Sequence, residues 1–518
     1  MIGPKAFSKT ISTTFYLYFS IILPAIAFGN LQEANTGGDI NVAKVLVGQV
    51  VGGLVFSLLA GQPLVVVMTT APLVLFTKII IEVASNIGVP FLPFFALVGF
   101  WNSFFLIIYA VFNLSKLMKY SSRATEETFG NFISIALTVD ALKHLVKEFQ
   151  KYYVPAGHTE MKAASLPSPT GSAVSETMEQ MVKVSDICCY GGKTQGSDLG
   201  NSTMDTIGEM CYPCQRDVPL LYLILMLGTV WLGVSLFNFI KTPYLSARKR
   251  ELLSDYSLPV AVIVFSVIGS AAFNLVHLES FKFDGKIDIQ IVPFGELFDG
   301  EKNAVGAIFL SMVLGLSLSI LFFMDQNISA AMVNSPENHL KKGNAYHWDL
   351  VVVAVINTFT AMFGLPFMHA VLPHSPLHVQ CLADKETRVS GGYATSVVTH
   401  VRETRLTTLL SNILIGITLT FLHIILKYIP KAVLDGLFLY MAVTALYGNQ
   451  MFERVSLLVT EQSAYPPNHY IKRVPQSKMH RFTAFQVSFS AYLIIIPIIF
   501  FFTAVYALAR ASLIADKT

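Results

Sequence analysis

Two short stretches of the chain share one pattern: G-Q-P-L-V-V-V-M-T-T-A-P-L from Gly61 to Leu73, and G-L-P-F-M-H-A-V-L-P-H-S-P-L from Gly364 to Leu377. Each begins with Gly-x-Pro, continues with an apolar run that favours a strand, and ends with polar residues, a second proline and leucine. In a membrane protein this pattern predicts a span that crosses partly as extended chain and becomes helical halfway. Because proline fits the first turn of a helix, Pro72 and Pro376 are expected to mark the beginnings of two half-helices.

The doubling of this pattern points to a carrier. Interrupted spans at corresponding places in two halves of a membrane protein often mark the binding site of a secondary transporter. Two half-helix N-termini that meet in mid-membrane would present free N–H groups and two positive dipole ends, which favour an anion. The alternative is that glycine and proline only kink ordinary helices, but the repetition of the pattern argues against it.

The composition places the chain in a membrane. Of its 518 residues, 53% are hydrophobic and only 13% are charged, which is unlike a soluble domain. The net charge of +3 gives no indication of nucleic-acid binding. Hydropathy predicts thirteen apolar segments, most of them near the roughly 20 residues that a spanning helix needs: residues 12–30, 43–60, 63–86, 93–113, 128–147, 219–240, 257–276, 304–333, 349–365, 366–384, 406–427, 431–447 and 482–508.

Charge and cysteine placement predict the topology. Lysine and arginine concentrate after the fourth, sixth, eighth, tenth and twelfth segments, so the N-terminus and these loops are predicted to be cytoplasmic. The long loop 148–218 is then extracellular, and it contains the glycosylation sequon Asn201-Ser-Thr. Four cysteines in this loop predict two disulfides with three possible connectivities; a Cys-x-x-Cys zinc site is the alternative, although no clustered histidines accompany it. The four are Cys188, Cys189, Cys211 and Cys214.

The broken spans divide the chain into two repeats. We expect a first repeat over 1–276 with spans 1–7, an extracellular connector over 277–303, and a second repeat over 304–518 with spans 8–13. The broken span is the third of each repeat and enters from opposite sides, as in many carriers. The predicted fold is an all-α polytopic membrane protein with an inverted seven-plus-seven repeat, its last span missing. The cytoplasmic connector 448–481 is expected to include a helix on the membrane surface.

Polar groups in or beside the broken spans are the candidate substrate-binding residues. Asp325 lies inside the eighth segment, where a carboxylate is costly unless it is paired, hydrated or protonated. It serves either transport or a structural contact with a neighbouring span. Thr69 and Thr70 precede the first half-helix, and His374 and Ser375 precede Pro376 in the second; they can contact a ligand or cap the helices. A histidine at this place would make the site sensitive to pH.

Other ionisable residues are expected to be structural. His369 is expected to be a packed strand residue, and Asp435, near the end of a span, to reach the membrane interface. The sequence contains no zinc signature, nucleotide-binding loop or nucleophile motif, so it predicts neither an enzyme nor a cofactor.

Several longer motifs carry a resemblance to a known family. P-E-N-H-L-K-K-G-N-A-Y-H-W-D-L from Pro336, V-R-E-T-R from Val401 and V-L-D-G-L-F-L-Y-M from Val433 resemble the bicarbonate transporter family, family four of the solute carriers, which includes the red-cell anion exchanger. I-S-T-T-F-Y-L-Y-F, P-H-S-P-L-H-V and A-Y-P-P-N-H-Y-I-K-R-V-P-Q are similar to its bicarbonate-transporter-related branch of sodium borate cotransporters. The resemblance runs from about residue 5 to residue 490.

This resemblance implies fourteen helices in a core and a gate domain, forming a homodimer in the plasma membrane. Substrate would lie between the third and tenth spans and move with the core. Relatives that exchange anions carry arginine at the position of His374 and glutamate at that of Asp325. The loss of a fixed cation favours movement of H⁺ or OH⁻, with borate or ammonia as further candidates, over sodium-coupled bicarbonate transport or chloride/bicarbonate exchange. The expected partners are small inorganic ions and the lipid bilayer.

One alternative belongs to another class. From the resemblance, the large N-terminal cytoplasmic domain of the family and its last span are expected to be missing. A truncated subunit or scaffold that does not transport is therefore a second hypothesis.

Overall fold

The computed structural model describes residues 4–116, 123–152, 187–191, 209–213, 216–273, 276, 289–293, 304–372, 374–390, 393–447, 449–461 and 474–488. Within these ranges, five helices are long and apolar enough to cross a membrane. They are Lys9–Thr36, Val42–Leu59, Phe91–Val111, Asp217–Lys241 and Gly306–Val333. Shorter apolar helices cover Ser257–Ala272 and Leu406–Leu422.

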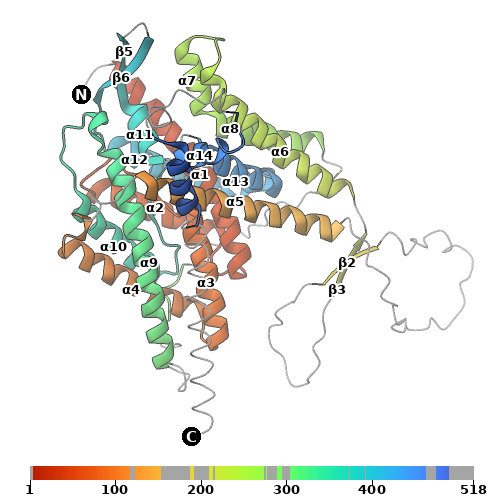
Figure 1. Cartoon of the computed structure of the whole chain (residues 1–518). Coiled ribbons are helices and arrows are strands. Elements are labelled where there is room, and N and C mark those ends of the chain that lie inside the picture. The colour runs from red at the N-terminus through yellow and green to blue at the C-terminus, as the bar shows by residue number, and fades with distance from the viewer. Residues whose placement is uncertain are drawn as a thin grey trace, which may run out of the picture.

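The described residues of the first half of the chain are mostly helical (Figure 1). Its elements are α1 (Pro4–Thr36), α2 (Val42–Leu59), β1 (Val67–Met68), α3 (Ala71–Ile87), α4 (Phe91–Val111), α5 (Arg123–Tyr152), β2 (Ile187–Gly191), β3 (Glu209–Pro213), α6 (Asp217–Asn238), α7 (Ala247–Asp255) and α8 (Ser257–Val267). A π-helical turn, Ile268–Ala272, continues α8.

The second half repeats the same plan. Its elements are α9 (Ala304–Val333), α10 (Tyr346–Met362), β4 (His369–Ala370), α11 (His374–Leu382), β5 (Ala383–Ser390), β6 (Tyr393–Val401), α12 (Leu406–Tyr428), α13 (Lys431–Leu446) and α14 (Gln450–Ser456). The predicted apolar segments up to 431–447 agree with these helices to within a few residues at most ends, although α1 and α5 extend further. Most of the predicted segment 482–508 lies outside the described residues. The helix α14 falls within the connector 448–481.

The helices pack in two groups. One contains α1 to α4 and α9 to α12, with α4 against both α9 and α10, and α2 against α12. The other contains α5, α6, α8 and α13, and α1 contacts α13 between the groups. Small residues allow close approach: a Cβ atom on Gly436 of α13 would lie 2.7 Å from the carbonyl oxygen of Met226 in α6.

Both broken spans have the predicted form. Strand β1 pairs with β4 in antiparallel orientation, with Val67 opposite Ala370 and Met68 opposite His369. The half-helix α3 begins at Ala71 with Pro72 in its first turn, and α11 begins at His374. The prediction of half-extended spans is confirmed, and the alternative of kinked helices is wrong, because a strand pairing replaces the helical hydrogen bonds at each break.

Some elements were not predicted. Strands β5 and β6 form a hairpin after α11, and α7 is a polar helix between α6 and α8. At the base of the hairpin, Asp384 pairs with Lys9 of α1 at 3.0 Å and with Arg402 at 3.4 Å. Within the described residues, the otherwise all-α fold therefore contains three two-stranded ladders: β1–β4, β2–β3 and β5–β6.

Candidate functional site

The crossing of β1 and β4 is stabilised by side chains from the surrounding helices. In a membrane interior, extended backbone needs such partners because lipid offers none. Each contact below satisfies a peptide group that the two-residue ladder leaves unpaired. The Ala370 N–H donates to Gln326 (3.0 Å), the Met368 N–H to Asn357 (2.9 Å) and the Val66 N–H to Ser375 (3.0 Å), while Gln49 donates to the Val67 carbonyl (3.0 Å).

Asp325 and His369 meet at this crossing. Asp325 lies on α9, and its Oδ2 atom is 3.1 Å from Nε2 of His369 in β4; the two side chains are 3% and 1% exposed. The other ring nitrogen of His369, Nδ1, is 2.8 Å from the Ala370 carbonyl. Thr70, the N-cap residue of α3, places its hydroxyl 3.1 Å from the same Nε2. The aspartate thus contacts the first half-helix through His369.

The other predicted residues lie around this pair. Thr69 donates to the Phe367 carbonyl at 3.0 Å, and Ser375 donates to the Val371 carbonyl at 2.8 Å. Their hydroxyls therefore connect or cap the broken spans. His374 turns toward α1, where its Nε2 is 2.9 Å from the Ser20 carbonyl. The ionisable partner of the Asp325 carboxyl group is His369, so the expectation that His369 is a packing residue alone is incomplete.

Buried polar atoms without a hydrogen-bond partner in the described part of the chain cluster on the same elements. They include Oδ1 of Asp325, Nε2 of Gln326 and Nδ1 of His374. Buried polar groups are nearly always satisfied by protein, water or ligand. These atoms give the crossing both acceptors and a donor for a small polar ligand.

A third histidine in the second broken span is fully engaged. His378 in α11 donates from Nδ1 to the Leu64 carbonyl at 2.9 Å. Its Nε2 is 2.8 Å from the Thr407 hydroxyl of α12. This imidazole joins α11 to the first broken span and to α12.

A second buried polar cluster lies in the other helix group. Asp435 of α13 is 2% exposed and lies 3.1 Å from Nδ1 of His144 in α5. It also accepts a hydrogen bond from the Tyr222 hydroxyl of α6. The prediction that Asp435 reaches the interface is wrong, because its helix directs it between α5 and α6.

Residues of two motifs quoted above, the one from Pro336 and V-R-E-T-R, bind the backbone where the first broken span begins. Asp349 accepts hydrogen bonds from the backbone N–H groups of Gly61 (2.6 Å) and Gln62 (3.3 Å). Trp348 donates to the Leu59 carbonyl at 2.6 Å. Arg405 donates to three carbonyls at the end of α2. A Cβ atom on Gly61 would lie 2.3 Å from the Cβ of Ala345, so glycine is required for this approach.

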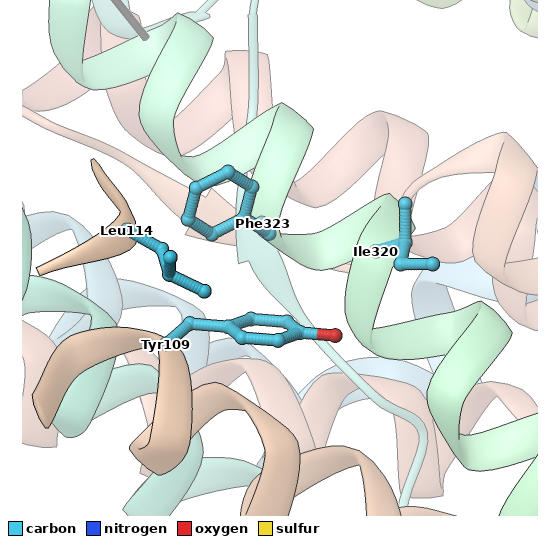
Figure 2. Close-up of a pocket in the computed structure, with 4 residues that line it drawn as sticks. All are labelled: Tyr109, Leu114, Ile320 and Phe323. Atoms are coloured by element: carbon cyan, nitrogen blue, oxygen red, sulfur yellow. The ribbon is translucent and has the colours of Figure 1, made fainter. Parts of the chain in front are cut away.

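An apolar crevice lies apart from these residues. It has a volume of about 210 Å³ and is lined by Tyr109, Leu114, Ile320 and Phe323. Figure 2 shows the Phe323 and Leu114 side chains on one face of the Tyr109 ring. It contains none of the predicted site residues. Among the described residues, no group of three His, Cys, Asp or Glu side chains is arranged to hold a metal ion.

The extracellular loop predictions remain predictions. Asn201 and Cys214 lie outside the described residues. In the backbone pairing of β2 with β3, Cys189 lies opposite Cys211 and Cys188 opposite Tyr212.

A membrane domain in which two half-helices begin beside one crossing of extended chain is an inverted-repeat transporter fold. The chain shares this fold with the transmembrane domain of a cyanobacterial bicarbonate transporter, BicA, with a TM-score of 0.55 at 14% identity, covering 94% of this chain and 97% of that one. SLC26A9 matches with a TM-score of 0.52 at 14% identity, covering 88% and 60% of the two chains.

Sequence comparison identifies the family. Residues 5–509 match the model of the HCO3⁻ transporter integral membrane domain. The chain is 44% identical to solute carrier family 4 member 11 of Mus musculus and of Homo sapiens, covering 93% of this chain and 54% of each relative. It is 30% identical to the sodium-driven chloride bicarbonate exchanger of Rattus norvegicus, covering 93% of this chain and 44% of that protein. The chain belongs to the bicarbonate transporter family of multi-pass membrane proteins, and it spans about half the length of these curated relatives.

Proposed function

We propose that this protein is a secondary transporter that moves H⁺ or OH⁻ across the plasma membrane, with borate or ammonia as candidate co-substrates. The observation that carries the proposal is the contact of the buried Asp325 carboxyl with His369 at the crossing of the two broken spans. Both groups can exchange a proton, and they lie beside the first turn of α3. We also propose that the protein acts as a homodimer, as the family resemblance implies.

The chemistry of the crossing supports this substrate class. The half-helices α3 and α11 direct their N-termini toward the crossing, and such ends favour negative charge. In the described part of the chain, the side chains that contact the crossing are an acid, an imidazole, hydroxyls and amides rather than lysine or arginine. A site of this kind offers donors to a small oxyanion or hydroxide, and its charge varies with protonation instead of being fixed.

The second candidate is sodium-coupled bicarbonate transport or chloride/bicarbonate exchange. The names of relatives favour it, since the sodium-driven chloride bicarbonate exchanger and the electrogenic sodium bicarbonate cotransporter 1 of Rattus norvegicus are each 30% identical to this chain. These relatives extend well beyond the aligned part, so their names alone do not assign the substrate of this chain.

The test is a record of intracellular pH and membrane current in cells that express the whole chain. Flux of acid equivalents that persists without bicarbonate and without sodium is the expected result. A strict requirement for bicarbonate would refute the first proposal in favour of the second. No flux in any medium, with normal surface expression, would refute both and favour the non-transporting subunit or scaffold.

A further inference from the structure

We propose that Asp325 and His369 form a single proton-binding site, in which one shared proton sets the charge of the crossing during transport. This inference rests on the proposed function and names the residues of that same site. It assigns the titrating imidazole to His369 in β4, whereas the sequence pattern alone pointed to His374.

The hydrogen bond at Nδ1 fixes the protonation of His369. The Ala370 carbonyl, 2.8 Å away, is only an acceptor, so Nδ1 must carry a hydrogen. In a neutral imidazole the remaining nitrogen, Nε2, then carries a lone pair and can only accept a hydrogen bond. That nitrogen is the one that faces Asp325.

The contact between the two side chains requires a further proton. Nε2 and the Asp325 Oδ2 are 3.1 Å apart, which is hydrogen-bond distance. An ionised carboxylate and a neutral Nε2 would present only lone pairs to each other. The pair therefore holds one proton in addition to that on Nδ1, either as carboxylic acid with neutral imidazole or as carboxylate with imidazolium.

The surroundings favour a pair with zero net charge. The two side chains are almost fully buried, at 3% and 1% exposure, and an isolated charge at such a place is costly. The ring of Phe322 packs edge-on against the imidazole with centroids 4.9 Å apart. Both arrangements of the shared proton are neutral overall, so the proton can move between the two atoms without creating a net charge.

Loss or gain of a proton changes the site by one full charge. Deprotonation of the pair leaves a net charge of −1, and a second proton gives +1. The Thr70 hydroxyl connects Nε2 to the N-cap of α3, while Oδ1 of Asp325 has no partner among the described residues. The charge of the pair can therefore affect both the start of α3, through Thr70, and a ligand bound at Oδ1 of Asp325.

Among the described residues, Asp325 is the one titratable side chain in contact with the His369 ring. From α9 the recorded contacts are Asp325 and the Phe322 ring, and from the start of α3 the Thr70 hydroxyl. On either side of His369 in the chain, amides of Asn357 in α10 and Gln326 in α9 bind the backbone of Met368 and Ala370. Within the described residues, the proton at this place is thus shared by two groups only.

The other two histidines of this span differ in one respect. His374 and His378 also donate to backbone carbonyls, of Ser20 and Leu64. Their remaining nitrogens face no recorded carboxylate: His378 has the Thr407 hydroxyl, and Nδ1 of His374 has no partner in the described structure. Replacement of His378 therefore provides a matched control, because its imidazole is buried in the same broken span but has no carboxylate in contact among the described residues.

The test combines single and double variants in the full chain. His369→Gln keeps an amide that can donate to Asp325 but does not titrate, and Asp325→Asn keeps an amide that can donate to Nε2. We expect each to lower proton flux at least tenfold per surface molecule and to remove its dependence on pH. The double variant should be no worse than either single variant, since residues acting as one unit are not additive. His378→Gln should leave the pH profile unchanged.

A spectroscopic measurement separates this inference from the proposed function. Infrared difference spectra of purified protein between acid and alkaline pH report carboxyl and imidazole protonation. His369→Gln should shift the carboxyl band assigned by Asp325→Asn, and His369→Asn, which keeps the donor to Ala370, should do the same. Unshifted bands, an additive double variant, or an unchanged pH profile would overturn the shared site. Absence of proton flux in the unaltered protein would instead refute the proposed function, and the spectra would still test the pair.

Discussion

Arg405, in the V-R-E-T-R motif, offers a sharp test of how the first broken span is held. Its guanidinium donates to the carbonyls of Ser57 (2.9 Å), Leu58 (3.0 Å) and Ala60 (2.5 Å). These carbonyls lie where α2 ends, so they have no partners further along the helix. The positive charge also lies at the negative end of the α2 dipole.

The expected cost follows from these contacts. Three hydrogen bonds at about 1 kcal/mol each, plus about 0.5 kcal/mol from the dipole, give a loss of roughly 3.5 kcal/mol in the free energy of unfolding for Arg405→Ala. Arg405→Lys keeps the charge but loses the fork of donors, so about half of the loss is expected. In the same motif, Arg402 pairs with Asp384 at 3.4 Å between side chains that are 26% and 40% exposed. Arg402→Ala should cost less than about 1 kcal/mol.

The assay is the fraction of detergent-purified protein that stays monodisperse after a graded heat challenge. The predicted order of midpoints is parent, then Arg402→Ala, then Arg405→Lys, then Arg405→Ala. If both alanine variants lose the same amount, the α2 carbonyls do not depend on Arg405. If neither alanine variant has a lower midpoint than the parent, the motif does not stabilise this end of the span.

Four further outcomes are expected. Asn201→Gln should abolish the glycosidase-sensitive mobility shift; a persistent shift would refute the extracellular placement of loop 148–218. Gly99→Val should cost about 1–3 kcal/mol or more, because a Cβ atom there would lie 2.6 Å from the Phe367 ring, whereas Gly306→Ala, with nothing within 4 Å, should be nearly neutral on the same heat challenge. Partial burial alone would raise the pKa of the Asp384 carboxyl, but Lys9 and Arg402 together hold this pKa below its ordinary value. The contribution of Asp384 to the stability of the hairpin base should therefore be complete above about pH 4 and be lost only as the pH falls through that lowered pKa. The Asp384→Asn variant and the parent should then differ in the rate of proteolysis of the hairpin at pH 7 and have the same rate in acid. His374→Arg should shift anion selectivity toward chloride or bicarbonate in current recordings. An unchanged selectivity would show that His374 is not part of the binding site.

Much of the architecture could be predicted because the breaks are local. Gly61 and Pro72, like Gly364 and Pro376, dictate where helix can and cannot form, so the half-helices follow from short patterns. The pairing of two extended runs about 300 residues apart depends on tertiary structure and not on local sequence. The same holds for the register that places Met68 opposite His369.

The partners of buried acids could not be predicted from spacing. His374 lies five positions after His369, and residues 370–372 between them are not helical, so helical periodicity does not say which imidazole meets Asp325. Asp435 was misjudged for a related reason: its position near a span end suggested water, but the neighbouring helices bring His144 and Tyr222 against it. The hairpin β5–β6 had no signal that distinguished it from a loop.

The pairing of β1 with β4 also sets an order of events during synthesis. Val67 and Ala370 are about 300 residues apart, so at about 5–20 residues per second the ribosome needs roughly 15–60 s to supply the second strand after the first. During that interval the extended run after Gly61 has peptide groups that lipid cannot satisfy. The first broken span must therefore be sheltered by water at the interface or by the insertion machinery until the other half arrives. The first half of this chain therefore cannot complete its broken span until the second half has been made.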